Sequence, residues 1–330
     1  MTWLAWRQFR VQAFTAVAGL VALGVVLAYT GPHLVGLYHS SGIAQCQASH
    51  GDCGPLIDDF TSHYPLLHIL DPLVLIIPGL VGVFWGAPLL ARELETGTYR
   101  LVWTQSITRT RWLATKVILV GIASIVVTGA VSVMVALWSS PLDAASGNRF
   151  NPGTFSVRGI VPFGYAAFAF ALGLAAGAAI RRLLPAMATT LFAFAAVRFS
   201  FQQWVRPHLA TARHVTTPLF GAQQGAPGAA AGTPGVHPND WVVSAHAVNA
   251  AGHTVAVDRN TLRAICGLPK GEFSQGALQS CGQRLRLHSV LTIQTASRYW
   301  PFQGWETAVF GVLAIALIVF GFWWTRQRIT

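Results

Sequence analysis

The residue types best suited to bind a partner stand together in one short segment, Arg92-Glu93-Leu94-Glu95-Thr96-Gly97-Thr98. Its two carboxylates, Glu93 and Glu95, can pair with Arg or Lys side chains of a partner through charge-assisted hydrogen bonds. The same carboxylates can instead be solvated at the end of a helix, or pair with Arg92 or Arg100 of their own chain. The segment therefore predicts a charged contact site.

The sequence predicts no catalytic residue and no cofactor bound by this chain. Lys116 and Lys270 are its only lysines, and neither belongs to the G-x-x-x-x-G-K-[ST] loop that holds nucleotide phosphates. A G-x-S-x-G nucleophile elbow is also absent. If ATP drives this protein, another chain must hydrolyse it.

Histidines and aspartates are frequent between residues 31 and 71. They are His33, His39, His50, Asp52, Asp58, Asp59, His63, His68 and Asp71. Such side chains ligate metals, but the H-E-x-x-H spacing of a helical metal site is missing. A polar loop with unrelated histidines is favoured over a metal site or a membrane enzyme.

The four cysteines form two pairs in hydrophilic segments, Cys46 with Cys53 and Cys266 with Cys281. The topology below places both segments outside the cell, where disulfides persist. A metal site is the alternative, but neither pair has C-x-x-C spacing. Two disulfides are the favoured interpretation.

The composition is that of an integral membrane protein. Hydrophobic residues make up 53% of the chain and charged residues 10%, whereas soluble domains carry about 25% charged residues. The net charge of +11 could suggest nucleic-acid binding, but no basic run with interleaved aromatics occurs in a soluble segment. Basic residues that flank membrane spans explain the charge better, so the lipid bilayer is a predicted partner and nucleic acid is not.

Six apolar runs are long enough to cross the hydrocarbon core, which takes about 20 helical residues. They are 12–30, 72–91, 116–138, 159–180, 183–204 and 304–324. The first run is too long for a signal peptide and has no clear cleavage site, so it is expected to remain as a span.

Basic residues concentrate in alternate connections between these spans. They are Arg7 and Arg10, then Arg92, Arg100, Arg109, Arg111 and Lys116, then Arg181 and Arg182, then Arg326 and Arg328. Loop 31–71 has none, and loop 139–158 has two. The positive-inside rule therefore places both termini in the cytoplasm of a cell with this protein in its plasma membrane.

We expect an all-α integral membrane protein with six transmembrane helices, an interfacial N-terminal helix and a small α+β extracellular domain. The expected parts are residues 1–204 with a cytoplasmic loop at 92–116, the extracellular domain at 205–303, and the sixth span with its tail at 304–330. Trp3, Trp6 and Phe9 indicate the N-terminal helix, although they can equally anchor span one. A flexible linker is expected at 220–238, and strands at 241–247, 253–257 and 285–295.

Two features inside the spans bear on packing and transport. Gly82 and Gly86 are four residues apart, as are Gly173 and Gly177, a spacing that allows close helix contact in a bundle or a dimer. Arg198 lies well inside span five. It either extends its side chain outward to the interface or serves a substrate path or a helix contact.

The loop at 92–116 carries a specific family signature. Gly97 can end a helix, Thr98 can cap the next one, and residues 99–103 form a short amphipathic piece. The signature residues are Glu93, Glu95, Gly97, Thr98, Leu101, Ile107, Thr108, Arg109 and Lys116. This loop resembles that of type-2 ATP-binding-cassette (ABC) exporter permeases. The phrases GAPLLARELETGT at 86–98 and ASRYWPFQ at 296–303 resemble permeases common in high-GC Gram-positive bacteria.

The resemblance implies two six-span subunits, a second copy or a paralogue completing the dimer, and separate ATPase subunits that bind ATP and Mg²⁺. It implies a coupling helix between spans two and three, with contact residues Arg92, Glu93, Glu95, Gly97, Thr98, Leu101, Thr108 and Arg109. The expected function is outward transport of a lipophilic or amphipathic substrate by alternating access. The alternative is a membrane sensor or immunity protein whose ectodomain binds an extracellular ligand. The substrate and the role of the ectodomain do not follow from the sequence.

Overall fold

The fold was analysed on a computed structural model of the 330-residue chain. The residues that it describes are 2–49, 53–62, 67–97, 108–146, 150, 152–219, 235–237, 239–256, 258–267 and 275–328. Most of them are helical, and a small antiparallel sheet lies in the C-terminal part.

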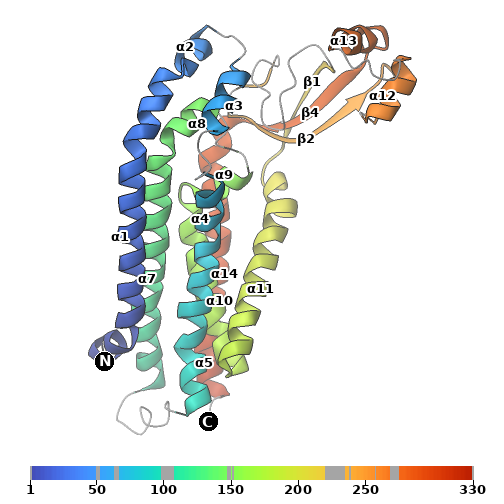
Figure 1. Ribbon diagram of the computed structural model, residues 1–330. Coiled ribbons are helices and arrows are strands. Elements are labelled where there is room, and N and C mark those ends of the chain that lie inside the picture. The colour runs from blue at the N-terminus through green and yellow to red at the C-terminus, as the bar shows by residue number, and fades with distance from the viewer. Residues whose placement is uncertain are drawn as a thin grey trace.

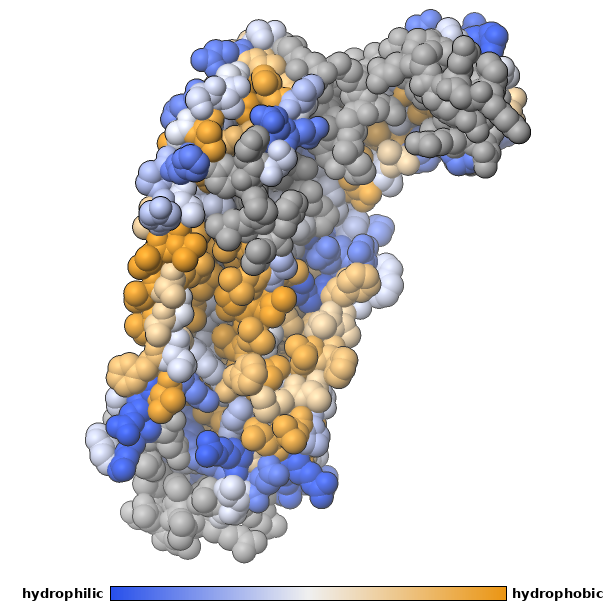
Figure 2. Space-filling model, in the orientation of Figure 1, coloured by the Kyte–Doolittle hydropathy of each residue, from blue (hydrophilic) through white to orange (hydrophobic). Residues whose placement is uncertain are grey.

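Six helices of the described chain are long and apolar enough to cross a membrane, the number predicted from the sequence. They cover Phe9–Ser40, Pro72–Thr96, Arg109–Trp138, Val161–Ile180, Leu183–His208 and Ala296–Gln327. Both chain ends lie at the same end of this bundle, and the sheet lies at the other (Figure 1). Figure 2 shows an apolar band around the middle of the visible face, with hydrophilic residues above and below it.

The first helix, α1 (Thr2–Ser40), is longer than the first predicted span. It includes the N-terminal residues, so these do not form a separate helix; its first turns lie across the foot of the bundle (Figure 1). Trp3 and Trp6 are exposed, whereas Phe9 is buried against Trp85. Trp3 and Trp6 are therefore available for the membrane interface, whereas Phe9 anchors the first span to the bundle.

Most of the described residues between 31 and 71, expected from the sequence to form a polar loop, are helical. The end of α1 occupies the first part of this range, and α2 (Ile43–Ala48), α3 (Gly54–Ser62) and the start of α4 (Leu67–Val81) follow. Ile43 and Phe60 are buried in one cluster with residues of α1 and α7. This apolar contact explains why a segment rich in polar residues is helical.

The second span is built from three consecutive helical pieces. They are α4, the π-helical turn η1 (Gly82–Gly86) and α5 (Ala87–Thr96). The remaining spans are α7 (Arg109–Trp138), α10 (Val161–Ile180), α11 (Leu183–Ser200) and α14 (Tyr299–Gln327). Two short helices, α8 (Ser140–Ser146) and α9 (Pro152–Val157), connect α7 to α10.

Helix α10 is the centre of the bundle and contacts α14, α5, η1, α7, α4 and α11. Its glycines meet those of the second span backbone to backbone. A Cβ atom at Gly173 would lie 2.3 Å from the Gly82 carbonyl oxygen, and one at Gly86 would lie 2.5 Å from the Phe170 carbonyl oxygen. The paired glycines thus form a contact within one subunit, because no larger side chain fits between these two helices.

Helix α11 continues through the π-helical turn η2 (Phe201–Val205) and the 3₁₀ turn η3 (Arg206–His208) into the sheet. The strands are β1 (Arg213–Pro218), β2 (Trp241–Val248), β3 (Thr254–Val255) and β4 (His288–Gln294), in the order β1-β4-β2-β3. β3 and β4 fall within the predicted strands, β2 extends one residue beyond its predicted strand, and β1 was not predicted. The expected linker lies almost wholly outside the described residues.

Both expected cysteine pairs are joined in the structure. Cys46 and Cys53 connect α2 to the start of α3, with Cα atoms 5.8 Å apart. Cys266 and Cys281 connect α12 (Arg259–Cys266) to α13 (Gln275–Arg284), with Cα atoms 5.5 Å apart. Since both bonds lie at the sheet end of the bundle (Figure 1), they stabilise the segments that the sequence places outside the cell.

The sheet packs on the bundle through an aromatic cluster. Trp241 of β2 stacks on Phe150, with ring centroids 5.7 Å apart, and Phe150 stacks on Phe155 of α9 at 5.5 Å. Asp240 accepts a hydrogen bond from the Ala296 N–H at 2.8 Å, at the turn η4 (Ala296–Arg298) that precedes α14. The last helix begins at Tyr299 rather than at 304, so Tyr299, Trp300 and Phe302 belong to its first turn.

Candidate functional site

The described residues of the predicted coupling segment belong to the end of α5 and the start of α7, at the end of the bundle that holds both termini (Figure 1). Gly97 ends α5 with φ 71°, the left-handed conformation that glycine adopts most readily. Thr108 caps α7, since its Oγ1 accepts a hydrogen bond from the Arg111 N–H at 3.4 Å. Thr98 and Leu101 lie outside the described residues, as does the amphipathic piece around Leu101.

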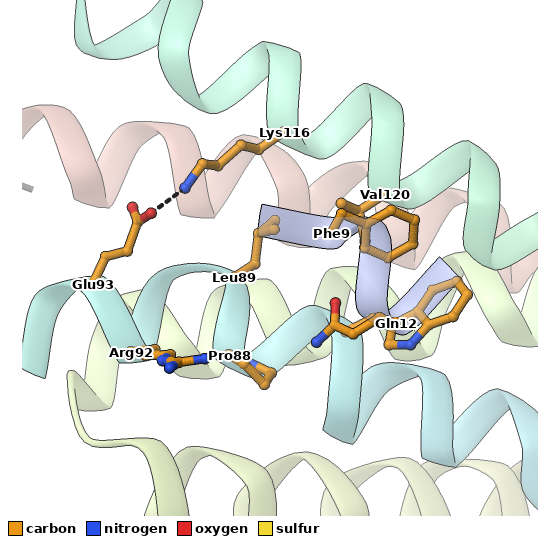
Figure 3. A pocket seen from close by; sticks show the side chains of 9 residues that line it. Phe9, Gln12, Pro88, Leu89, Arg92, Glu93, Lys116 and Val120 are labelled. Atoms are coloured by element: carbon orange, nitrogen blue, oxygen red, sulfur yellow. Dashed lines mark hydrogen bonds and ion pairs between the residues drawn. The ribbon is translucent and has the colours of Figure 1, made fainter. Parts of the chain in front are cut away.

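Glu93 contacts the third span. Its Oε1 accepts an ion-paired hydrogen bond from Nζ of Lys116 on α7 (Figure 3). The Lys116 ammonium also lies 4.7 Å from the ring centroid of Trp112. Because both partners are largely buried, this pair holds the end of α5 against the start of α7.

Glu95 contacts the fifth span. Its Oε2 accepts a hydrogen bond from the Leu183 N–H at 2.8 Å, so it caps the N-terminus of α11 from another helix. The positive end of the α11 dipole favours this carboxylate. Beside it, Nη2 of Arg181 donates to the Arg328 carbonyl oxygen after α14. Through Glu93 and Glu95, the end of α5 is therefore bound to the N-terminal parts of α7 and α11.

The other two predicted contact residues lie at the surface of the same end. Arg92 is exposed on α5 and Arg109 is half-buried in the first turn of α7. The structure thus brings Arg92, Glu93, Glu95, Gly97, Thr108 and Arg109 to one end of the bundle.

A second polar site lies near the opposite end, buried between α10, α11 and α14. Nε and Nη2 of Arg206 each donate a hydrogen bond to Glu306, both at 2.8 Å. Nη2 of Arg206 also donates to Ser156 at 2.9 Å, and the Tyr165 hydroxyl donates to Glu306. Arg206 and Glu306 are completely buried. Two parallel hydrogen bonds of this kind fix the orientation of both side chains.

Arg198 belongs to the edge of this site. Its guanidinium carbon lies 5.1 Å from the ring centroid of Tyr165, a cation–π contact. The Nε and Nη2 atoms are buried and have no hydrogen-bond partner among the described residues. The side chain therefore packs inward on α10 instead of extending to the interface.

Gln303 joins the same end of α14 to α10 and α9. Its Oε1 accepts hydrogen bonds from the Ile160 and Val161 N–H groups, both at 3.0 Å, and its Nε2 donates to the Phe155 carbonyl oxygen at 3.0 Å. Since Ile160 and Val161 begin α10, this buried amide satisfies backbone groups that a helix start leaves without partners. It also holds α14 in register with α10.

Sequence reasoning missed Arg206 and Glu306. Glu306 stands inside the predicted sixth span, and an acid at that depth was the available signal. Arg206 was assigned to the extracellular domain because the predicted fifth span ended at residue 204. The π-helical and 3₁₀ turns that extend α11 past this point have no clear pattern of apolar residues. Among the described residues, no three His, Cys, Asp or Glu side chains gather as a metal site requires.

The fold and these two sites define a membrane protein with six candidate spans and a group of charged residues at the end that holds both termini. The ABC-2 membrane transporter related family matches residues 17–206, more than half of the chain, and the chain belongs to this family. The family is of permease type, without catalytic activity, and implies an ABC transporter complex. No curated protein and no solved structure matches the chain.

Proposed function

We propose that this chain is the transmembrane subunit of an ATP-driven ABC exporter. A separate ATPase subunit binds ATP and Mg²⁺, and a second copy of the chain or a paralogue completes the permease dimer. The observation that carries the proposal is the segment that contains Glu93 and Glu95, because it leaves the bundle beside both termini and its carboxylates contact two spans. The resemblance of the two sequence phrases suggests a high-GC Gram-positive host.

The proposed orientation has both termini in the cytoplasm and the sheet outside. Basic residues support it, since Arg92, Arg111, Arg181 and Arg328 all belong to the end opposite the sheet. The two disulfides agree with it, because an oxidising compartment preserves them.

The contacts suggest how ATPase movement reaches the outer half of the bundle. A displacement of the loop after α5 would move the end of α5, which carries Glu95. Glu95 would pass this movement to α11, because its side chain accepts a hydrogen bond from the N–H of Leu183, the first residue of α11. Helix α11 then continues through its π-helical turn to Arg206, which is bound to Glu306 of α14. Alternating access in this proposal is a tilt of α11 and α14 against the central helix α10.

Arg198 lies on the proposed substrate path. Its buried Nε and Nη2 atoms, which have no hydrogen-bond partner among the described residues, suit an anionic group on a lipophilic or amphipathic cargo. A buried cation whose N–H groups are not all hydrogen-bonded is costly, and cargo binding would offset that cost.

The test is purification of the chain from its native membranes in mild detergent, followed by identification of bound subunits. We expect a stoichiometric ATP-binding subunit. Leu101→Asp, in the loop between α5 and α7, should abolish its binding. The matched control is Leu56→Asp on α3, an exposed leucine at the sheet end, which should leave binding unchanged. Purification of the chain alone under every mild condition would refute the proposal.

Two substitutions at Glu95 separate its roles. Glu95→Gln keeps an oxygen that can accept the Leu183 hydrogen bond but removes the charge, whereas Glu95→Lys removes both. If the carboxylate pairs with the ATPase, both variants lose ATPase stimulation; if it only caps α11, Glu95→Gln retains it. A sensor, the alternative function, predicts instead that deletion of 222–298 abolishes all activity while no variant of the loop has an effect.

A further inference from the structure

A pocket of about 400 Å³ lies between α1, α5 and α7 at the end of the bundle that holds both termini (Figure 3). Residues from α1, η1, α5 and α7 line it. They are Phe9, Gln12, Trp85, Pro88, Leu89, Arg92, Glu93, Lys116 and Val120. It lies apart from the buried site around Arg206 and shares Arg92 and Glu93 with the predicted coupling segment.

The pocket is amphipathic along its length. Figure 3 shows Arg92, Glu93 and Lys116 at one end, with Phe9 and Val120 at the other. Phe9 and Trp85 pack edge to face, with ring centroids 4.9 Å apart. An apolar chain can lie along this aromatic end while a polar group remains at the charged end.

The charge balance of the pocket favours an anion. Glu93 is engaged by Lys116, so the Arg92 guanidinium is the remaining formal charge. Arg92 is exposed, and its guanidinium makes no hydrogen bond or ion pair with another residue that the structure describes. Arginine binds phosphate oxygens through paired N–H groups.

The position of the pocket favours a membrane lipid over a soluble anion. Helix α1 beside it exposes apolar side chains, including Val11 and Phe14, both 66% exposed. Such a surface is suited to contact with acyl chains. The basic end of the bundle also attracts the anionic lipids of the leaflet that it faces.

We propose that this pocket binds one phospholipid with an anionic head group. Its phosphate lies at Arg92, and one acyl chain lies along Phe9, Leu89 and Val120. The lipid is a resident of the subunit rather than its cargo. It holds α1 against α5 next to the pair formed by Glu93 and Lys116, at the start of the predicted coupling segment.

The test is native mass spectrometry of the full chain, delipidated in neutral detergent and titrated with dioleoyl phosphatidylglycerol or dioleoyl phosphatidylcholine. We expect one retained phosphatidylglycerol, bound about tenfold more tightly than phosphatidylcholine, because the choline cation of phosphatidylcholine offsets the attraction between its phosphate and Arg92. Arg92→Gln should remove this preference and Arg92→Lys should keep most of it. The matched control Arg111→Gln, an exposed arginine of α7 outside the pocket, should leave it unchanged.

Two further arms test the apolar end. Leu89→Trp fills the pocket and should weaken both lipids, whereas Leu80→Trp, at a partly exposed position of α4, should not. Glycerol phosphate, the head group without acyl chains, should bind at least a hundredfold more weakly than the lipid, since burial of each CH₂ contributes about 0.8 kcal/mol.

The proposal is overturned by equal retention of the two lipids, by phosphatidylglycerol retention that survives Arg92→Gln, or by equal binding of glycerol phosphate. These measurements use the permease chain without an ATPase subunit. Their outcome is therefore independent of whether the chain is an exporter.

Discussion

Loss of the Glu306 carboxylate should destabilise the bundle more than any other single change in the buried polar site. Glu306→Leu keeps a side chain of similar size but removes the acceptor of three hydrogen bonds, two from Arg206 and one from Tyr165. It leaves the Arg206 guanidinium completely buried without an acid. Arg198 also loses its favourable electrostatic interaction with Glu306.

The magnitude follows from this geometry. Removal of one partner of a buried ion pair costs about 3–5 kcal/mol, because the other charge stays desolvated. Arg206→Met should cost less than Glu306→Leu, since Arg198 and the Tyr165 hydroxyl remain beside the carboxylate. The double variant has no ion pair to break. Its main cost is the buried Tyr165 hydroxyl without an acceptor, about 1–3 kcal/mol.

The prediction is therefore an order of stabilities: wild type, then the double variant, then Arg206→Met, then Glu306→Leu. Unfolding in mixed detergent micelles, followed by the fluorescence of the 12 tryptophans, measures it. Trp305→Leu is the control, because Trp305 is the neighbour of Glu306 but is 64% exposed to the lipid side; its effect should stay within about 0.5 kcal/mol. A double variant that loses the sum of both single losses would refute the reasoning, since the two residues would then be independent.

Three other predictions test the remaining features. Arg198→Met should keep or raise stability while export of an anionic cargo falls; loss of stability with normal export would remove Arg198 from the substrate path. Gly173→Ala should cost about 1–3 kcal/mol through contact with the second span, whereas Gly311→Ala, with open space around it, should be neutral or mildly stabilising in the same unfolding assay. All four cysteines are in disulfides, so an impermeant maleimide should label intact cells only after reduction from outside. Labelling that requires lysis would reverse the proposed orientation.

The spans could be predicted because their signal is local. A run of about 20 apolar residues has no other stable location than the bilayer, and the alternation of basic loops needs no knowledge of contacts. The same holds for Gly97 and Thr108, whose roles as helix end and helix cap follow from conformational preference and side-chain chemistry. Both cysteine pairings also follow from sequence, because each pair shares one short hydrophilic segment.

The partners of the charged residues could not be predicted, since they lie far away in sequence. Glu93 and Glu95 were expected to contact another subunit or a neighbouring arginine. In the structure they meet Lys116 and the Leu183 N–H. Strand β1 was missed because its burial depends on β4, which lies some seventy residues later.

The sequence alone determined that this chain has six runs long and apolar enough to cross a membrane, which of its connections are basic, and which transporter family it resembles. These properties depend on composition and short spacing, which persist in any conformation. Only the tertiary structure decided that Arg206 lies against Glu306, that Arg198 packs on Tyr165, and that the glycines of two spans meet. A buried charge selects its partner by distance in space, and helix packing sets that distance.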